Sequence, residues 1–140
     1  MSISIHVTEK SDENVRRQLV ESLFASNQEK VGPNHYKHLS ILLGDGTNTL
    51  GGLWGRTAYG WLYTELLFVP ESLRGQGYGT LLMQCAEKEA LVRGCHSAWL
   101  DTYEFQGPTF YERLGYKAFG QLENYPEPYT HFFMHKRLRP

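Results

Sequence analysis

Three glycines at alternate positions follow an arginine in the segment RGQGYG, residues 74–79. Glycine permits positive φ angles and carries no side chain, so several backbone N–H groups of such a turn can converge on one anion. An apolar run with helical periodicity comes next, and the first N–H groups of a helix lack internal acceptors and carry partial positive charge. Arg74 adds charge at the rim. The segment therefore predicts an anion site, with a plain strand-to-helix connection as the alternative.

The elements around this turn predict a strand–helix–strand unit. Residues 59–69 form an extended run that stops at Pro70, residues 78–93 are helical up to Gly94, and residues 96–103 form the next strand. The two strands of such a unit are parallel, and its crossover is right-handed. The apolar stripe of the helix consists of Leu81, Leu82, Cys85, Ala86 and Ala90.

The rest of the chain predicts a mixed α/β fold in a single domain of residues 1–140. At the N-terminus we expect a strand at residues 3–7 and a helix that Ser11 caps. Two further extended runs, 37–46 and 49–58, precede residues 59–69 and suit an antiparallel meander. After a short helix near Pro108, the segments KAFGQLE and THFFMHKRL are expected to form a hairpin joined by the loop NYPEPY.

Composition narrows the function classes. The net charge is -1 and no long basic run occurs, which argues against a general nucleic-acid binder. The apolar runs are too short to cross a bilayer, and the N-terminus lacks the pattern of an export signal, so we expect a cytoplasmic protein without a membrane partner. The histidine pairs His35 with His38 and His131 with His135 lack acidic or cysteine ligands at familiar spacing, so no metal is expected.

Two motifs are similar to those of the GNAT superfamily of acyl-CoA-dependent N-acetyltransferases. Residues 74–79 match its Arg/Gln-x-x-Gly-x-Gly/Ala motif, and YERLGY, residues 111–116, is similar to its Tyr-x-x-x-Gly-aromatic segment. The resemblance covers most of the chain and is weakest over the first 50 residues. It implies a largely antiparallel sheet that is splayed at the parallel strand pair beside the glycine turn, with helices on both faces.

The resemblance also implies acetyl-CoA as the acetyl donor. Backbone groups of Leu67, Phe68 and Val69 would pair with the pantetheine arm like an added strand, and the N–H of Phe68 or Val69 would polarise the acetyl carbonyl. The family often has asparagine where this chain has Glu104, and Gln106 could supply that contact to the pantetheine instead. The pyrophosphate would be held beside Arg74 by Gly75, Gln76, Gly77, Tyr78, Gly79 and Thr80.

Acyl transfer to an amine needs a base for the nucleophile and an acid for the leaving thiolate. Strand alternation predicts one face formed by Tyr59, Trp61, Tyr63, Glu65 and Leu67, on which Glu65 is the only carboxylate and our candidate base. The alternative is a strand-edge carboxylate paired with an arginine, and a bulge in this strand would also change the face on which Glu65 lies. By the resemblance, Tyr111 is the general acid, since phenols and thiols have pKa values of about 8.5 to 10. Its alternative role is that of a packed helix tyrosine.

The acceptor is expected to be a primary amine of a small molecule, with direct attack on acetyl-CoA. Alternatives are a protein N-terminus or lysine as acceptor, or a non-catalytic acyl-CoA-binding regulatory module. Members of the superfamily are frequently dimers, and the C-terminal aromatic segment could supply an interface or form an internal hairpin. A pocket for a small cationic amine could be walled by Trp54, Tyr59, Trp61, Tyr63, Asp101, Tyr103, Tyr125 and Tyr129.

Overall fold

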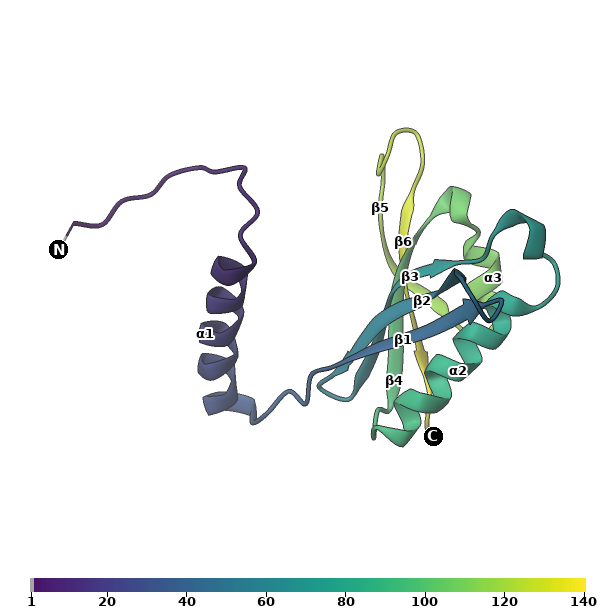
Figure 1. The fold of residues 1–140 in the computed structure, drawn as a ribbon, viewed down its shortest axis with the longest axis horizontal. Coiled ribbons are helices and arrows are strands. Elements are labelled where there is room, and N and C mark those ends of the chain that lie inside the picture. Colours follow the sequence, from purple (N-terminus) through teal and green to yellow (C-terminus); the bar gives the residue numbers. More distant parts are fainter. Residues whose placement is uncertain (1) are drawn as a thin grey trace. The chain divides into compact units, whose positions relative to one another are not determined.

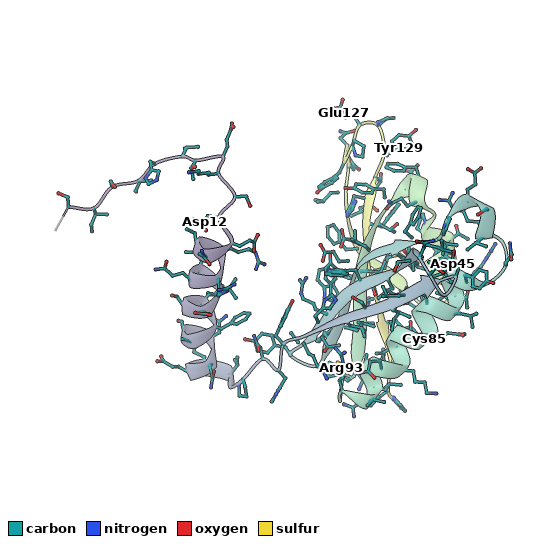
Figure 2. The ribbon with its side chains drawn as sticks, viewed as in Figure 1. Asp12, Asp45, Cys85, Arg93, Glu127 and Tyr129 are labelled. Carbon is teal, nitrogen blue, oxygen red and sulfur yellow. The ribbon has the colours of Figure 1, made fainter. Side chains whose placement is uncertain are left out.

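The computed structural model describes residues 2–140, which divide into a unit ending at Asn34 and a second unit, His35–Pro140. The first unit contains one helix, α1 (Glu13–Val31), shown in purple in Figure 1. Its N-cap is Asp12, labelled in Figure 2, whose side chain accepts hydrogen bonds from the N–H groups of Asn14 and Val15. The prediction of Ser11 as the cap is therefore wrong by one residue. Residues 3–7 form no strand, which corrects the prediction made from their alternation.

The second unit is built on one six-stranded sheet, and the course of its strands can be followed in Figure 1. The strands lie in the order β1-β2-β3-β4-β6-β5, and every neighbouring pair is antiparallel except β3 and β4. This arrangement confirms the predicted mixed α/β fold with a largely antiparallel sheet and one parallel pair. The strands are β1 (Lys37–Gly44), β2 (Thr49–Ala58), β3 (Trp61–Phe68), β4 (Ser97–Tyr103), β5 (Lys117–Leu122) and β6 (His131–Arg137).

The parallel strands β3 and β4 separate before either of them ends. Their pairing runs from Trp61 opposite Ser97 to Thr64 opposite Leu100 and goes no further, although β3 continues to Phe68. Backbone groups of the last part of β3 therefore lose β4 as a partner on this side. The predicted splay lies at this point, directly before the glycine turn.

Helix α2 (Tyr78–Val92) connects β3 to β4 and packs on one face of the sheet. Its buried residues join strand residues such as Leu62 and Leu100 in the main hydrophobic core. Gly94, with a φ of 85°, follows the end of the helix as predicted. The predicted stripe is wrong by part of a turn because Leu81 and Cys85 are exposed. The residues of α2 that are buried are Leu82, Met83, Ala86 and Ala90.

The C-terminal part forms the predicted hairpin. Strand β6 lies between β4 and β5, so the C-terminal aromatic segment is an internal strand, and an interface role for it is not needed to explain its composition. A short helix, α3 (Pro108–Arg113), and two single turns, η1 (Glu71–Leu73) and η2 (Glu104–Gln106), complete this unit. Across residues 2–140, no helix combines the length and apolar character needed to span a membrane.

Candidate functional site

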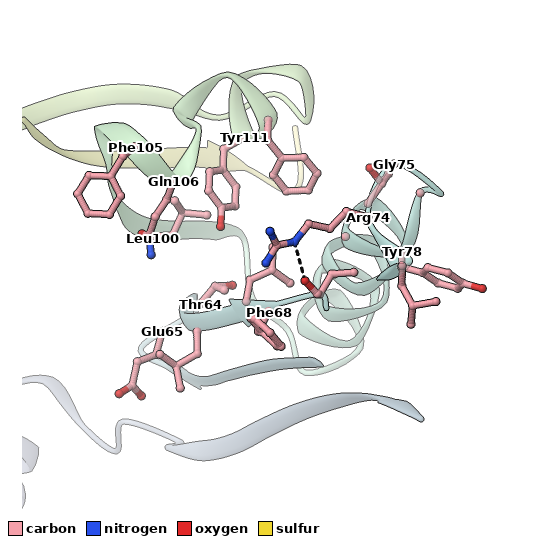
Figure 3. Close-up of a pocket in the computed structure, with 18 of the residues that line it drawn as sticks. Thr64, Glu65, Phe68, Arg74, Gly75, Tyr78, Leu100, Phe105, Gln106 and Tyr111 are labelled. Atoms are coloured by element: carbon pink, nitrogen blue, oxygen red, sulfur yellow. Dashed lines mark hydrogen bonds between the residues drawn. The ribbon is translucent and has the colours of Figure 1, made fainter. Parts of the chain in front are cut away.

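A cleft of about 920 Å³ opens where β3 and β4 separate. Figure 3 shows side chains that line it, from the end of β3, the glycine turn, η2 and α3. The cleft brings together Glu65, Tyr111 and every predicted cofactor-binding residue except Gln76. It is also lined by Thr64, Leu66, Leu73, Leu100, Asp101, Phe105 and Phe110.

The glycine turn has the geometry of an open anion site. Gly75 and Gly77 have φ angles of 75° and 86°, and a Cβ at either position would meet no atom within 4 Å beyond the chain neighbours. The first hydrogen bond of α2 runs from the N–H of Leu81 to the carbonyl of its N-cap, Gly77, so the earlier N–H groups have no partner within the helix. Gly77 has no side chain that could accept from them. Gly79 has a different role, because a Cβ there would lie 3.2 Å from the Phe110 ring. Two glycines keep the site open and the third lets α3 approach.

Arg74 and Gln76 hold the turn in place. The Nε of Arg74 donates to the Val69 carbonyl at 2.8 Å, the dashed line in Figure 3, and its guanidinium lies 5.9 Å from the centre of the Phe68 ring. The Gln76 side chain donates to the Ser72 carbonyl at 3.3 Å, which fixes it against η1. Arg74 thus joins the end of β3 to the turn in addition to placing positive charge in the cleft.

A bulge in β3 changes the predicted arrangement of its side chains. Trp54 of β2 pairs with Leu66 but Gly55 pairs with Thr64, so Glu65 is the extra residue. Before the bulge, Leu62 belongs to the core, and after it Leu67 packs on the same core. The prediction that Tyr63, Glu65 and Leu67 share one face is therefore wrong, because one inserted residue reverses the alternation. Glu65 is exposed at the rim, and Figure 3 shows its carboxylate directed away from Tyr111.

Tyr111 lies in α3 with its ring half-buried against the Phe110 ring, at 5.0 Å between centroids. Its position is fixed by Tyr116, at the other end of the motif YERLGY. The buried Tyr116 donates a hydrogen bond from its hydroxyl to Glu87 of α2 at 2.8 Å, and its N–H donates to the Tyr111 carbonyl. Glu87 also forms an ion pair with Lys136 at 2.7 Å. The second motif thus anchors α3 to α2 and to β6 and leaves the Tyr111 side chain facing the cleft.

Burial raises the pKa of Tyr111 to about 12, and the negative charge of Asp101 adds to this effect. The phenol is therefore neutral at all ordinary pH values and can donate a hydrogen bond. The matched acidities expected from sequence are not found, because a thiol has a pKa of about 8.5. Complete proton transfer from Tyr111 to a thiolate would therefore be uphill.

Asp101 is the second carboxylate of the cleft and is held from two sides. The Tyr63 hydroxyl donates to its Oδ1 at 2.7 Å, and His131 Nε2 lies 2.8 Å from its Oδ2. Burial raises the pKa of Tyr63, with further contributions from the hydrogen bond and the charge of Asp101. His131 is only 3% exposed, so the Asp101 carboxylate is fixed by a buried group behind it.

The cleft passes through the sheet. Thr64 and Leu100 are buried on the face that carries α2, whereas their neighbours Tyr63 and Asp101 meet on the opposite face. A donor held at the glycine turn and an acceptor held at Asp101 could therefore approach each other from opposite faces. Thr64 was missed in the sequence analysis, and its buried hydroxyl has no hydrogen-bond partner among the described residues. A ligand in the cleft could supply that partner.

The predicted acceptor walls are only partly brought together. His131 contacts the rings of Tyr103 and Tyr125 and lies within hydrogen-bond distance of Asp101. Asp101 in turn accepts a hydrogen bond from Tyr63. Three others lie elsewhere: Trp54 packs on His38, Trp61 packs on His96, and Tyr59 is exposed in the turn between β2 and β3.

The residues after β4 have separate roles. The Gln106 side-chain oxygen accepts a hydrogen bond from the Tyr103 N–H at 3.4 Å, which leaves the amide –NH₂ group of Gln106 available to the cleft. The Glu104 carboxylate instead accepts a hydrogen bond from the N–H of Thr130, which lies at the end of the β5–β6 loop.

Comparison with known proteins is consistent with this geometry. The family model described as the acetyltransferase (GNAT) domain matches residues 36–118. An acetyltransferase of Agrobacterium fabrum is 38% identical over 117 residues, which cover 83% of this chain and 85% of that protein. The blasticidin-S acetyltransferase of Streptomyces morookaense is 37% identical over 89 residues, covering 63% of this chain and 65% of that protein.

Solved structures share the fold. A crystal structure from Agrobacterium tumefaciens, described as an acetyltransferase, superposes with a TM-score of 0.89 and 34% identity over 96% of this chain and 99% of that one. An aminoglycoside 6'-N-acetyltransferase in complex with coenzyme A superposes with a TM-score of 0.64 and 21% identity over 99% and 98% of the two chains. At that identity, the second likeness concerns the fold alone.

Proposed function

We propose that this chain, which belongs to the acetyltransferase (GNAT) domain family, transfers the acetyl group of acetyl-CoA directly to a primary amine of a small molecule. One observation carries the proposal: a single cleft through the sheet has the open glycine turn at one part and Tyr111 and Asp101 at another. The relative named as a blasticidin-S acetyltransferase supports a small-molecule acceptor.

The donor would lie along the end of β3. Backbone groups of Leu67 and Phe68 would pair with the pantetheine arm, in the stretch where β3 has left β4. The N–H groups from Gly75 to Thr80 would bind the pyrophosphate, with Arg74 alongside. The Val69 carbonyl already accepts a hydrogen bond from Arg74. Gln106 is therefore the better candidate to bind the pantetheine amide that lies nearer the pyrophosphate.

The reaction would be a direct displacement. The amine nitrogen forms a bond to the acetyl carbon, the carbon–sulfur bond breaks, Glu65 takes the proton from nitrogen directly or through water, and Tyr111 donates to the departing sulfur. The N–H of Phe68 or Val69 would stabilise the oxyanion. No cysteine or serine is among the residues lining the cleft, which supports direct attack over a covalent acyl-enzyme.

An acceptor screen tests the proposal. The protein and acetyl-CoA should release free coenzyme A thiol in the presence of at least one class among polyamines, aminoglycosides, amino acids and short peptides. A preference for peptides would favour the alternative of a protein acetyltransferase. Binding of acetyl-CoA in calorimetry, with no thiol release for all acceptor classes, would instead indicate a regulatory module. Absence of acetyl-CoA binding would contradict the enzyme and the regulatory module alike.

Replacement of the candidate base should change the pH dependence of the reaction. If Glu65 is the base, Glu65→Gln should lower kcat/KM about 100-fold and remove its acidic limb, since the protonatable group would be gone. The measurement is kcat/KM from pH 5.5 to 9. Glu71→Gln, an exposed carboxylate of η1 outside the cleft, serves as the control. An unaltered acidic limb in Glu65→Gln would assign the base to another group.

A further inference from the structure

Four aromatic side chains form a continuous wall beside the cleft. We call Tyr103, Phe105, Tyr125 and Tyr129 the aromatic wall. The rings of Tyr103 and Phe105 are nearly parallel, with 5° between their planes and 5.2 Å between centroids, and Tyr129 meets Phe105 edge-on at 5.1 Å. Phe105, Tyr125 and Tyr129 are 56%, 47% and 41% exposed. Since Phe105 also lines the cleft, the wall extends the cleft surface outward.

Hydrogen bonds hold the wall in position. The N–H of Glu104 donates to the Thr130 carbonyl at 2.9 Å, and the Glu104 carboxylate accepts from the Thr130 N–H at 3.1 Å. Within the loop, Tyr125 N–H donates to the Tyr129 carbonyl, and Tyr129 N–H donates to the Pro126 carbonyl. Glu104, which departs from the family pattern, thus ties η2 to the loop that carries Tyr125 and Tyr129. The wall is preorganised, and a ligand would not have to order it.

Asp101 supplies negative charge at the inner end of the wall. It lines the cleft, and its contact His131 lies against Tyr103 and Tyr125, at 4.4 and 4.6 Å between ring centroids. Arg56 is nearby but stacks on the Tyr63 ring, at 4.5 Å from its centroid. Over residues 2–140, no lysine or arginine forms an ion pair with Asp101. An exposed aromatic surface that adjoins a carboxylate free of a permanent cation is complementary to a cationic, planar ligand.

We propose that Asp101 and the aromatic wall form the acceptor subsite, and that this subsite selects alkylamines in which a short aliphatic linker joins the ammonium group to a planar aromatic or heteroaromatic ring system. Asp101 receives the ammonium, and the exposed faces of the wall stack on the ring. This inference rests on the proposed acetyl transfer, to which it adds the class of acceptor.

Benzylamine and cyclohexylmethylamine are matched probes, because they have the same charge and similar size but only the first is planar. We expect kcat/KM to favour benzylamine about three- to tenfold in the full chain, the range typical of aromatic contacts. The double variant Phe105→Leu/Tyr129→Leu should bring the ratio to about one. Phe119→Leu, on the same hairpin and 59% exposed but outside the wall, should leave the ratio unchanged. Asp101→Asn should weaken both amines about tenfold or more and keep the ratio.

Equilibrium binding of both amines to the coenzyme A complex, measured by calorimetry, separates this inference from the proposed function. Turnover of both amines with equal kcat/KM, or a preference that survives the double variant, would overturn the aromatic subsite and leave acetyl transfer intact. Selective binding of benzylamine that depends on the wall, without thiol release, would support the subsite and contradict the proposed function. Binding of neither amine would overturn the subsite.

Discussion

Tyr111→Phe should lower kcat about 100- to 1,000-fold, the lower part of the range that a positioned acid contributes, while acetyl-CoA binds with nearly unchanged affinity. The variant keeps the ring that packs against Phe110 and removes only the hydroxyl. The phenol is neutral and faces the cleft, so its hydroxyl is our proposed hydrogen-bond donor to the departing sulfur. Steady-state kcat and a calorimetric Kd for acetyl-CoA are the two measurements.

The pH dependence gives a second readout for the same residue. The pKa of Tyr111 is raised to about 12, so the donating, protonated form persists as pH rises and is lost only as pH passes that value. Wild-type kcat should therefore show no falling limb from Tyr111 up to pH 10.5.

Tyr59→Phe, a change in an exposed turn, is the matched control for Tyr111→Phe and should leave kcat unchanged. Equal kcat in Tyr111→Phe and wild type would remove Tyr111 from the chemistry.

The raised pKa also refines the role of Tyr111. With this raised pKa the phenol is a weaker acid than a thiol, whose pKa is about 8.5. A hydrogen bond to the sulfur therefore fits the geometry better than complete proton release, with the proton lost by the amine able to neutralise the thiolate in the end. The sequence could not predict this, because the pKa depends on burial and on the charge of Asp101, which comes from a different strand.

Local signals predicted the geometry of the glycine turn. Residues 74–79 combine glycine spacing with a following helical run, and the structure places the positive φ angles of Gly75 and Gly77 at the start of α2. These features depend on neighbours in the chain, so sequence alone is sufficient. The same holds for the strand–helix–strand unit and its parallel pair.

The strand that carries Glu65 was predicted less well because of one inserted residue. Period-two alternation assumes an unbroken ladder, but the register between β2 and β3 shifts at Trp54 and Gly55. Nothing in the local pattern of residues 59–69 marks that shift. The cluster of Asp101, Tyr63 and His131 was harder still to predict, because these residues come from three strands. They meet only through the order in which β3, β4 and β6 lie.

Gly77→Asp should raise the Kd for acetyl-CoA about 100-fold relative to Gly77→Asn. Asparagine and aspartate both tolerate the left-handed φ of 86° at this position, and a Cβ there meets no atom within 4 Å beyond the chain neighbours. The two side chains have the same shape, so the difference between them is one negative charge. Repulsion from a pyrophosphate about 6 Å away would cost about 3 kcal/mol at an effective dielectric constant of 20.

The pair of variants also separates binding from stability. An aspartate at the N-cap of α2 interacts favourably with the helix dipole, so Gly77→Asp should unfold at a temperature equal to or above that of Gly77→Asn in the absence of ligand. A loss of affinity that accompanies an undiminished Tm can then only come from the site, and it should shrink as salt is added because ions screen the repulsion. Equal Kd values for the two variants would place the pyrophosphate away from the glycine turn and remove the observation on which the donor assignment depends.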